Sequence, residues 1–177
     1  MANVVNIAGL DEDSITNGPG LRYVIFTQGC PHHCPGCHNP QTHPFGTGRD
    51  FTVDELYRKI TANPLETGVT FSGGEPFCQA APLAELAVKL KKDGYEIAVY
   101  TGFTFEYLKD SLDPGIQKLL HHIDVLVDGK FILAQRDILL RFRGSSNQRI
   151  LNVPESLRLN EAVLMADEDW AGIPAEY

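Results

Sequence analysis

Three of the four cysteines of the chain lie within eight residues, in the stretch CPHHCPGC that runs from Cys30 to Cys37. A disulfide framework explains this poorly, because such frameworks distribute paired cysteines along a chain, whereas the fourth cysteine, Cys78, stands alone. Clustered thiols are typical of a metal site in a reducing compartment. We therefore expect Cys30, Cys34 and Cys37 to be metal ligands in a cytoplasmic protein.

The spacing C-x3-C-x2-C leaves two alternatives for the metal. A structural zinc site is closed by four ligands, and His38, His43 or Cys78 could supply the fourth. A [4Fe-4S] cluster is usually held by four thiolates, so three cysteines would leave one iron free to bind another molecule. An open metal position indicates a site for chemistry rather than for structure.

Length, composition and charge favour a single globular domain. The chain has 177 residues, 43% of them hydrophobic, and no run of apolar residues long enough to span a membrane. Its formal charge of -8 opposes binding to phosphate backbones. We expect one domain over residues 1–177, with no nucleic-acid and no membrane partner. The acidic C-terminal stretch, residues 166–177, follows no assignable pattern and is expected to be a flexible tail or a partner-docking segment.

Strand and helix patterns alternate along the chain. Short β-branched or aromatic runs predict strands at residues 22–28, 68–72, 96–101, 123–127 and 149–153. Helical spacing and capping residues predict helices within residues 51–63, 81–94, 105–110 and 114–122. Such alternation is typical of a parallel sheet, which places the residues after each strand at one edge. The expected fold is α/β, a partial TIM-like (βα) barrel of about five or six mostly parallel strands.

The cysteine spacing resembles the signature of radical S-adenosylmethionine enzymes. In that family the three cysteines hold a [4Fe-4S] cluster, and the amino and carboxylate groups of S-adenosylmethionine chelate the remaining iron. The resemblance implies that the reduced cluster cleaves the sulfonium and that a 5'-deoxyadenosyl radical removes a hydrogen atom from the substrate. One [4Fe-4S] cluster and S-adenosylmethionine are therefore the expected cofactors.

A second motif, SGGEPF at residues 72–77, follows the cysteine loop. Its paired glycines permit positive φ and a close backbone approach, and an ordinary strand-to-helix turn would explain them too. Together with the cysteines it resembles the GGE motif of the same family. That resemblance implies that Gly73, Gly74 and Glu75 bind the methionyl ammonium group through backbone and carboxylate. Cys78, just beyond, is expected to be a small buried hydrophobe.

The resemblance also implies further contacts with the cosubstrate. It places Thr101 near it, with Asp128 facing the cosubstrate or a nearby cation and Lys130 orienting it. A salt bridge between loops is the alternative for these two charges. Many members have an aromatic residue against the adenine just before the last cysteine, where this chain has Gly36. Adenine recognition is therefore expected from His38 or from backbone.

Six stretches resemble one family in particular, the activating proteins of anaerobic, class III ribonucleotide reductases. They are NGPGLR, GCPHHCPGC, SGGEP, TGF, DVLVDGKF and RGSSNQ, in that order. The resemblance implies that the hydrogen atom comes from a glycine of the large subunit of that reductase, which becomes a stored glycyl radical. Since only Cys78 remains outside the motif, a second all-cysteine cluster is excluded, and an external low-potential donor of the flavodoxin or ferredoxin type is expected.

Three other functions remain as alternatives. The partner of an activase could be another glycyl radical enzyme, such as pyruvate formate-lyase. The chain could instead be a small-molecule radical S-adenosylmethionine enzyme resembling 7-carboxy-7-deazaguanine synthase. A non-enzymatic iron-sulfur or zinc module is the third alternative, and metal and sulfide analysis of anaerobically purified protein separates it from the others.

Overall fold

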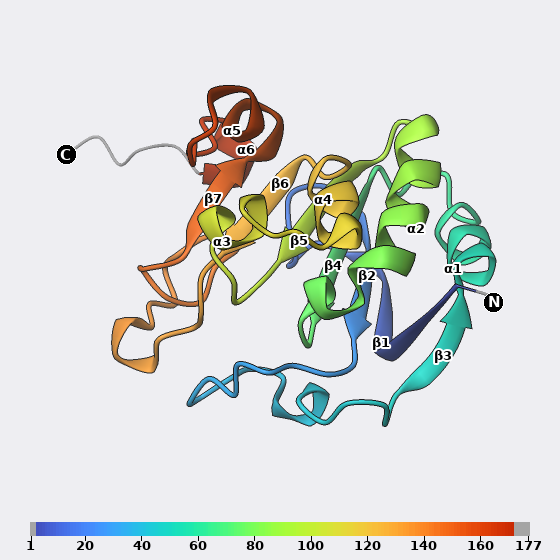
Figure 1. Ribbon diagram of the computed structural model, residues 1–177, viewed down its shortest axis with the longest axis horizontal. Helices are drawn as coiled ribbons and strands as arrows, with labels where there is room; N and C mark the ends of the chain where they lie inside the picture. The colour runs from blue at the N-terminus through green and yellow to red at the C-terminus, as the bar shows by residue number, and fades with distance from the viewer. Residues whose placement is uncertain (1–2, 172–177) are drawn as a thin grey trace.

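The central strands of the fold run parallel, in a computed structural model that describes residues 3–171 (Figure 1). The sheet has seven strands in the order β3-β1-β2-β4-β5-β6-β7. Its four parallel strands are β2 (Arg22–Thr27), β4 (Gly68–Gly73), β5 (Glu96–Tyr100) and β6 (Val125–Asp128). The predicted α/β fold with a parallel centre is therefore confirmed.

Both edges of the sheet are antiparallel, which differs from the prediction. On one side, β1 (Val4–Ser14) pairs antiparallel with β2, and β3 (Arg49–Thr52) pairs antiparallel with β1. On the other side, β7 (Arg149–Asn152) pairs antiparallel with β6. A parallel β7 would need a crossover, usually a helix. The β6–β7 connection carries only η3 (Leu133–Gln135), a single short 3-10 helix, and the chain returns beside β6.

Four helices in the connections between strands lie over one face of the sheet (Figure 1). They are α1 (Val53–Ile60), α2 (Ala80–Lys92), α3 (Phe105–Lys109) and α4 (Pro114–Leu120), as predicted. The predicted capping box begins α1, because the Thr52 hydroxyl accepts from Glu55 N while the Glu55 carboxylate accepts from Thr52 N. The remaining helices are η1 (Pro40–Thr42), η2 (Pro76–Gln79), α5 (Val153–Leu159) and α6 (Glu168–Ala171). None of the helices within residues 3–171 has the length and apolar character that crossing a bilayer requires.

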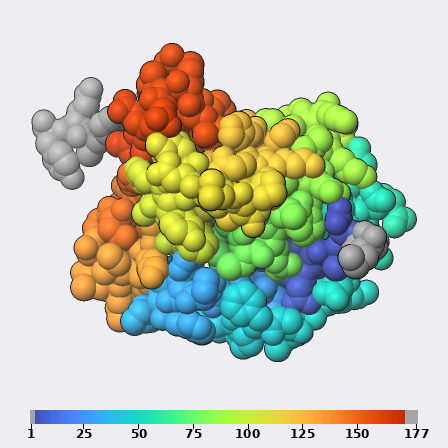
Figure 2. All heavy atoms as spheres, in the orientation of Figure 1, coloured from blue at the N-terminus to red at the C-terminus, as the bar shows by residue number. Residues whose placement is uncertain are grey.

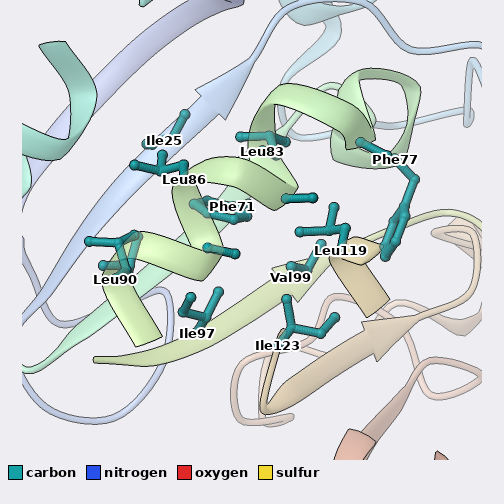
Figure 3. Close-up of a cluster of buried hydrophobic side chains, with 14 of the residues drawn as sticks. Ile25, Phe71, Phe77, Leu83, Leu86, Leu90, Ile97, Val99, Leu119 and Ile123 are labelled. Atoms are coloured by element: carbon teal, nitrogen blue, oxygen red, sulfur yellow. The ribbon is translucent and has the colours of Figure 1, made fainter. Parts of the chain in front are cut away.

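A hydrophobic core fills the space between these helices and the sheet (Figure 3). Alternate residues of the strands point into it, as the two-residue period of a strand requires. The strand residues include Ile25, Phe71, Ile97 and Val99, and the helix residues include Leu83, Leu86, Leu90 and Leu119. Full burial of one such side chain contributes about 1.5–3 kcal/mol. The core therefore fixes the sheet, and the loops at the sheet edge take their positions from it.

The opposite face of the sheet is covered in part by the C-terminal segment. Trp170 of α6 is only 1% exposed and packs there on Ala98, Val125, Val127 and Ile150. Its indole nitrogen donates to Glu96 Oε1 at 3.3 Å, and the Arg22 guanidinium lies 5.3 Å from its ring centroid. Residues 166–171 of the expected tail thus belong to the folded structure, and residues 172–177 lie outside the described residues.

Candidate active site

A cavity of about 390 Å³ opens at the carboxyl ends of the parallel strands. The loops after β2, β4, β5 and β6 contribute Cys30, Gly74, Thr101 and Gly129 to its wall. In open α/β sheets this edge is where ligands bind. The prediction that the residues following the strands meet at one edge is therefore confirmed.

All three cysteines of the motif line this cavity as free thiols. Backbone hydrogen bonds fix their loop, since Cys30 N donates to His43 O at 3.0 Å and Cys37 N donates to Cys34 O at 3.1 Å. Cys37 Sγ accepts a hydrogen bond from Asn39 N at 3.4 Å. These hydrogen bonds fix the backbone of the loop, and the three thiols therefore line the cavity before any metal binds.

The donor set fits an iron-sulfur cluster better than a single zinc ion. Among residues 3–171, no three His, Cys, Asp or Glu side chains converge closely enough to hold one metal ion. A cubane carries its irons at separate corners, so its thiolate ligands lie further apart. Cys78, one of the candidates for a fourth zinc ligand, is exposed on η2 and does not line the cavity. The prediction that Cys78 is a buried hydrophobe is also wrong.

Burial raises the pKa of the Cys30 thiol above its ordinary value, and the nearby Glu75 carboxylate adds to the increase. Hydrogen bonds from the backbone of the same loop act in the opposite direction. A thiol must lose its proton to bind a metal, so metal binding at this loop is expected to release protons.

His43 gives independent support for a ligand in the cavity. Its side chain lines the cavity with the cysteines, and its Nε2 atom is buried without a hydrogen-bond partner among the described residues. An unsatisfied buried polar atom costs about 1–3 kcal/mol, so most such atoms have partners. A cluster or cosubstrate would supply one. From the sequence, His43 was expected only as a possible zinc ligand, and its position just beyond Cys37 was the signal for a place in the cavity wall.

The paired glycines of SGGEPF pack directly against the cysteine loop. Gly74 N donates to Thr27 O at 2.7 Å, and Glu75 N donates to Gly29 O at 2.8 Å. Gly73 has φ +92°, and a Cβ there would lie 2.6 Å from Thr27 N, while a Cβ on Gly74 would collide with the Gly29 carbonyl oxygen. Because an ammonium group is itself a donor, only acceptors such as the backbone carbonyls of this loop could bind it.

Gly74→Val is expected to lower the iron content as well as the affinity for S-adenosylmethionine. The new side chain would displace Gly29, the neighbour of Cys30. Iron analysis and calorimetric titration with S-adenosylmethionine measure the two effects. Gly9→Val is a matched control, because its nearest contact would be Phe26 Cδ2 at 3.9 Å. Full iron content in Gly74→Val would contradict this expectation and indicate a purely steric obstruction of the ligand.

Glu75 is fully buried, and its carboxylate joins three loops. Oε2 lies 2.7 Å from His32 Nε2 and accepts from Gly102 N at 2.9 Å. Oε1 accepts from Thr101 Oγ1 at 2.8 Å and from Phe77 N at 3.1 Å. The side chain is not part of the cavity wall. This geometry favours a positioning role, in which Glu75 ties the cysteine loop to the loop after β5.

The two charges of the DGK stretch lie outside the cavity wall. Asp128 is 1% exposed, and its carboxylate accepts from Arg149 Nε at 3.0 Å and from Phe105 N at 2.8 Å. Arg149 also pairs with Glu106 at 2.8 Å. Lys130 is exposed. The structure thus places Asp128 in a salt bridge, as the alternative for it proposed, but the bridge joins the paired strands β6 and β7 rather than two loops.

Aromatic side chains line the cavity although none precedes Cys37 directly. Gly36 has φ +73° and lies outside the cavity wall. His38 lines the cavity, with its ring centroid 5.2 Å from that of Phe131. Three aromatic residues that were not predicted from the sequence also line the cavity: Tyr100, Phe131 and Phe142. Phe131 follows the DGK stretch directly, and this adjacency was the signal for it.

A cavity walled by three cysteines at this edge defines the class of protein, an iron-sulfur domain with one cluster. The model of a family described as "4Fe-4S single cluster domain" matches residues 16–151. The anaerobic ribonucleoside-triphosphate reductase-activating protein of Vibrio cholerae is 41% identical over 145 residues, which are 77% of this chain and 90% of that protein. The chain therefore belongs to the family of anaerobic ribonucleoside-triphosphate reductase-activating proteins.

Two further proteins are similar over part of their length. The pyruvate formate-lyase-activating enzyme of Staphylococcus aureus is 36% identical over 148 residues, which are 80% of this chain and 58% of that enzyme. The crystal structure of QueE from Escherichia coli has 18% sequence identity and a TM-score of 0.47, covering 57% of this chain and 53% of that one. The second likeness is too weak to support a functional argument.

Proposed function

We propose that the protein activates an anaerobic ribonucleoside-triphosphate reductase by generating a glycyl radical on it. The observation that carries this proposal is the meeting of the three cysteines and the paired glycines in one cavity, in a chain 41% identical to a reductase-activating protein. When bound, a reduced [4Fe-4S] cluster supplies one electron to S-adenosylmethionine, giving methionine and the 5'-deoxyadenosyl radical that takes a hydrogen atom from glycine.

The parts of the cavity wall have separate roles in this proposal. The cluster ligands are Cys30, Cys34 and Cys37. Backbone carbonyls around Gly73 and Gly74 bind the methionyl ammonium group. Glu75 holds the three loops in register, and Thr101 supports it through the 2.8 Å hydrogen bond to its Oε1. The cosubstrate is thereby oriented by groups that are already fixed before it binds.

The remaining predicted site residues act around this centre. His38 contacts the adenine from the cavity wall, together with the neighbouring Phe131. Gly36 allows the positive φ that turns the loop toward Cys37. Asp128 and Lys130 lie outside the cavity wall and affect the cosubstrate only indirectly. The ion pair between Asp128 and Arg149 fixes the start of the loop after β6.

The wider organisation of the protein is part of the same proposal. Four parallel strands with helices on one face are the elements of a partial TIM-like (βα) barrel, within one domain over residues 1–177. An external low-potential donor supplies the electron, since the cysteine outside the motif lies apart from the cavity. Free thiols suit the cytoplasm, and the charge of -8 argues against a nucleic-acid partner. No membrane partner is proposed.

Label transfer tests the proposed function. Reconstituted, reduced protein is incubated anaerobically with S-adenosylmethionine and its cognate reductase, whose glycines carry α-deuterium. We expect one protein-borne glycyl radical in the electron paramagnetic resonance spectrum and deuterium in 5'-deoxyadenosine. Direct abstraction transfers the α-deuterium of the glycine to the 5'-deoxyadenosyl radical, and for this the reacting atoms must meet at about 3–3.5 Å. A reductase with alanine at the target glycine is the control. A radical formed without label transfer would rule out direct abstraction.

Similarity to the Staphylococcus aureus enzyme favours a second candidate, in which the partner is pyruvate formate-lyase. This chain spans only 58% of that enzyme. The same anaerobic assay separates the two candidates when each partner is offered alone. A radical on pyruvate formate-lyase and none on the reductase would select the second candidate.

A further inference from the structure

A second cavity, of about 460 Å³, opens at the amino ends of the parallel strands. Residues just before β4 and just before β5 line it, together with residues at the end of α1. Its wall includes Tyr57, Thr61, Glu66, Asp93 and Tyr95. The cavity of the candidate active site shares none of its lining residues. The second cavity therefore lies at the edge of the sheet opposite the cysteine loop (Figure 1).

The charge of the second cavity is negative. Glu66 and Asp93 contribute two carboxylates, and among residues 3–171 no lysine, arginine or histidine belongs to the wall. Both α1 and α2 end here, because Thr61 and Asp93 are their C-cap residues. The C-terminus of a helix carries a partial negative charge and favours cations. Two carboxylates and two helix ends therefore make this cavity attractive to a positive charge.

Basic side chains in the last turns of α1 and α2 do not belong to the wall. Lys89 pairs with Asp54, and its Nζ atom lies 5.6 Å from the centroid of the Tyr57 ring. Lys91 pairs with Asp124 at 2.7 Å. The other basic residues of these turns, all exposed, are Arg58, Lys59 and Lys92. Two of the lysines are thus neutralised by carboxylates that lie outside the wall.

Glu66 is the residue of the wall whose hydrogen bonding is incomplete. It is only 3% exposed, and its Oε1 atom accepts from Asp13 N at 2.9 Å. Its Oε2 atom is buried and has no hydrogen-bond partner among the described residues. Such orphaned polar atoms are rare, because a buried carboxylate is stable only when donors or opposite charges face it. A cation in the second cavity would supply the missing partner.

The pKa of Glu66 is consistent with this incomplete bonding. Burial raises it above its ordinary value, and the neighbouring Asp13 and Glu12 carboxylates add to the increase. The hydrogen bond from Asp13 N acts in the opposite direction. A bound positive charge would favour the ionised carboxylate and lower the pKa again.

Two tyrosines give the second cavity its aromatic part. Tyr57 belongs to α1 and Tyr95 directly precedes β5, and both pack partly on the core. The Tyr57 hydroxyl donates to Asp93 Oδ2 at 2.6 Å, which joins the end of α2 to α1. Figure 2 shows the green surface of α2 beside the teal surface of α1. Aromatic rings attract guanidinium and ammonium groups through their faces.

The composition of the wall favours an organic cation over a metal ion. Within the described part of the chain, no three His, Cys, Asp or Glu side chains converge closely enough to hold a metal. Calcium, for comparison, takes about six to eight oxygen ligands. We propose that the second cavity binds a small organic cation, an alkylguanidinium or alkylammonium group, whose charged head meets the two carboxylates and whose alkyl part lies on the tyrosines. This inference is independent of the proposed function.

Calorimetric titration of the anaerobically reconstituted full chain with butylguanidinium chloride tests the site. We expect a Kd of about 1 mM or lower, which a ligand of about eight non-hydrogen atoms can reach. Butylurea, a neutral molecule of the same shape, should bind at least about tenfold more weakly because it lacks the charge. Saturating S-adenosylmethionine should leave the Kd unchanged, since the two cavities have separate walls.

Three results of this titration would overturn the proposal. They are no binding of butylguanidinium, equal binding of butylurea, and displacement by S-adenosylmethionine, which would place the probe in the other cavity. Titration with N-acetylarginine methylamide identifies the source of the cation. Tighter binding than that of butylguanidinium indicates an arginine side chain of a polypeptide, and weaker binding indicates a free small molecule.

Glu66→Gln tests the unpartnered carboxylate. The amide can keep its oxygen in front of Asp13 N, so the variant should fold and keep the parent's iron content and affinity for S-adenosylmethionine. We expect its Kd for butylguanidinium to rise about tenfold or more, because hydrogen bonds between charged groups are the strong ones. Glu161→Gln, a change of the same chemistry at an exposed position outside the wall, should bind the probe like the parent.

Asp93→Asn is a second variant that does not depend on a buried position. Asp93 is exposed, and asparagine can still accept from the Tyr57 hydroxyl. Its Kd for butylguanidinium should rise about twofold to fivefold, as for a solvent-exposed ion pair. Parent-like affinity for the probe in both Glu66→Gln and Asp93→Asn would overturn the assignment of the site.

Discussion

Alanine in place of Cys30, Cys34 or Cys37 is expected to abolish cluster binding, whereas Cys78→Ala should retain nearly all of the iron. The first three thiols line one cavity, and Cys78 is exposed on η2 away from it. The cluster has only three protein ligands and one open iron. Each of these substitutions therefore removes one of the three thiolates that bind the cluster to the protein. The parent should contain about four irons and four sulfides per chain.

Iron and sulfide analysis of anaerobically reconstituted protein, with electron paramagnetic resonance of the reduced state, measures this expectation. Cys78→Ala is the internal control, since it removes a thiol without touching the cavity wall. If Cys78→Ala lost the cluster as completely as the other variants, the open-iron argument would be wrong. If the parent instead held one tightly bound zinc per chain and no sulfide, the non-enzymatic zinc module would be the better account.

The alternation of strand and helix patterns in the sequence was enough to predict the central parallel strands of the sheet and the helices that cover them. Period-two runs and capping residues identify the four parallel strands and their helices, because these elements bury a regular face. The N-terminal strand β1 escaped prediction for a physical reason. Val5 and Ile7 of β1 are buried in the core and Leu10 packs against it, but irregularities between Ile7 and Gly9 and between Asp11 and Ser14 disturb the register of the strand. Its sequence therefore shows too short an alternation to recognise.

The direction of β7 and the role of the C-terminal segment depend on contacts that local sequence does not encode. β7 has the composition of a core strand whichever way it runs, and only the missing crossover helix before it indicates a return beside β6. Trp170 stands in an acidic stretch with no periodicity. Its burial depends on Arg22, Glu96 and Phe142, which are distant in sequence.

Convergence of the site was predictable, but the partners of its charged residues were not. Parallel strands bring their following loops to one edge, so the meeting of the cysteines with Gly74 and Thr101 follows from topology. Glu75 and Asp128 are different, because a carboxylate that binds a ligand and one that accepts hydrogen bonds from protein groups look alike in sequence. Only the folded structure shows that both carboxylates are buried and accept hydrogen bonds from protein groups.

Glu75→Gln is expected to destabilise the protein and loosen the cysteine loop, although it keeps the shape of the side chain. Each carboxylate oxygen faces one backbone N–H, from Gly102 at Oε2 and from Phe77 at Oε1. Whichever way the amide is turned, its NH2 group meets a donor that cannot become an acceptor. An unsatisfied buried group costs about 1–3 kcal/mol, and a chain of this size loses about 2–4 °C of melting temperature per kcal/mol.

Thermal unfolding followed by circular dichroism should therefore show a fall of roughly 2–12 °C for Glu75→Gln in the metal-free protein. The cluster of the reconstituted variant should also lose iron to a chelator faster than the parent, because the contact at 2.7 Å between Glu75 and His32 anchors the cysteine loop. Glu161→Gln, a change of the same chemistry at an exposed position, should alter neither measurement. A parent-like melting temperature together with weaker S-adenosylmethionine binding would show instead that the carboxylate contacts the cosubstrate, as the GGE resemblance implies.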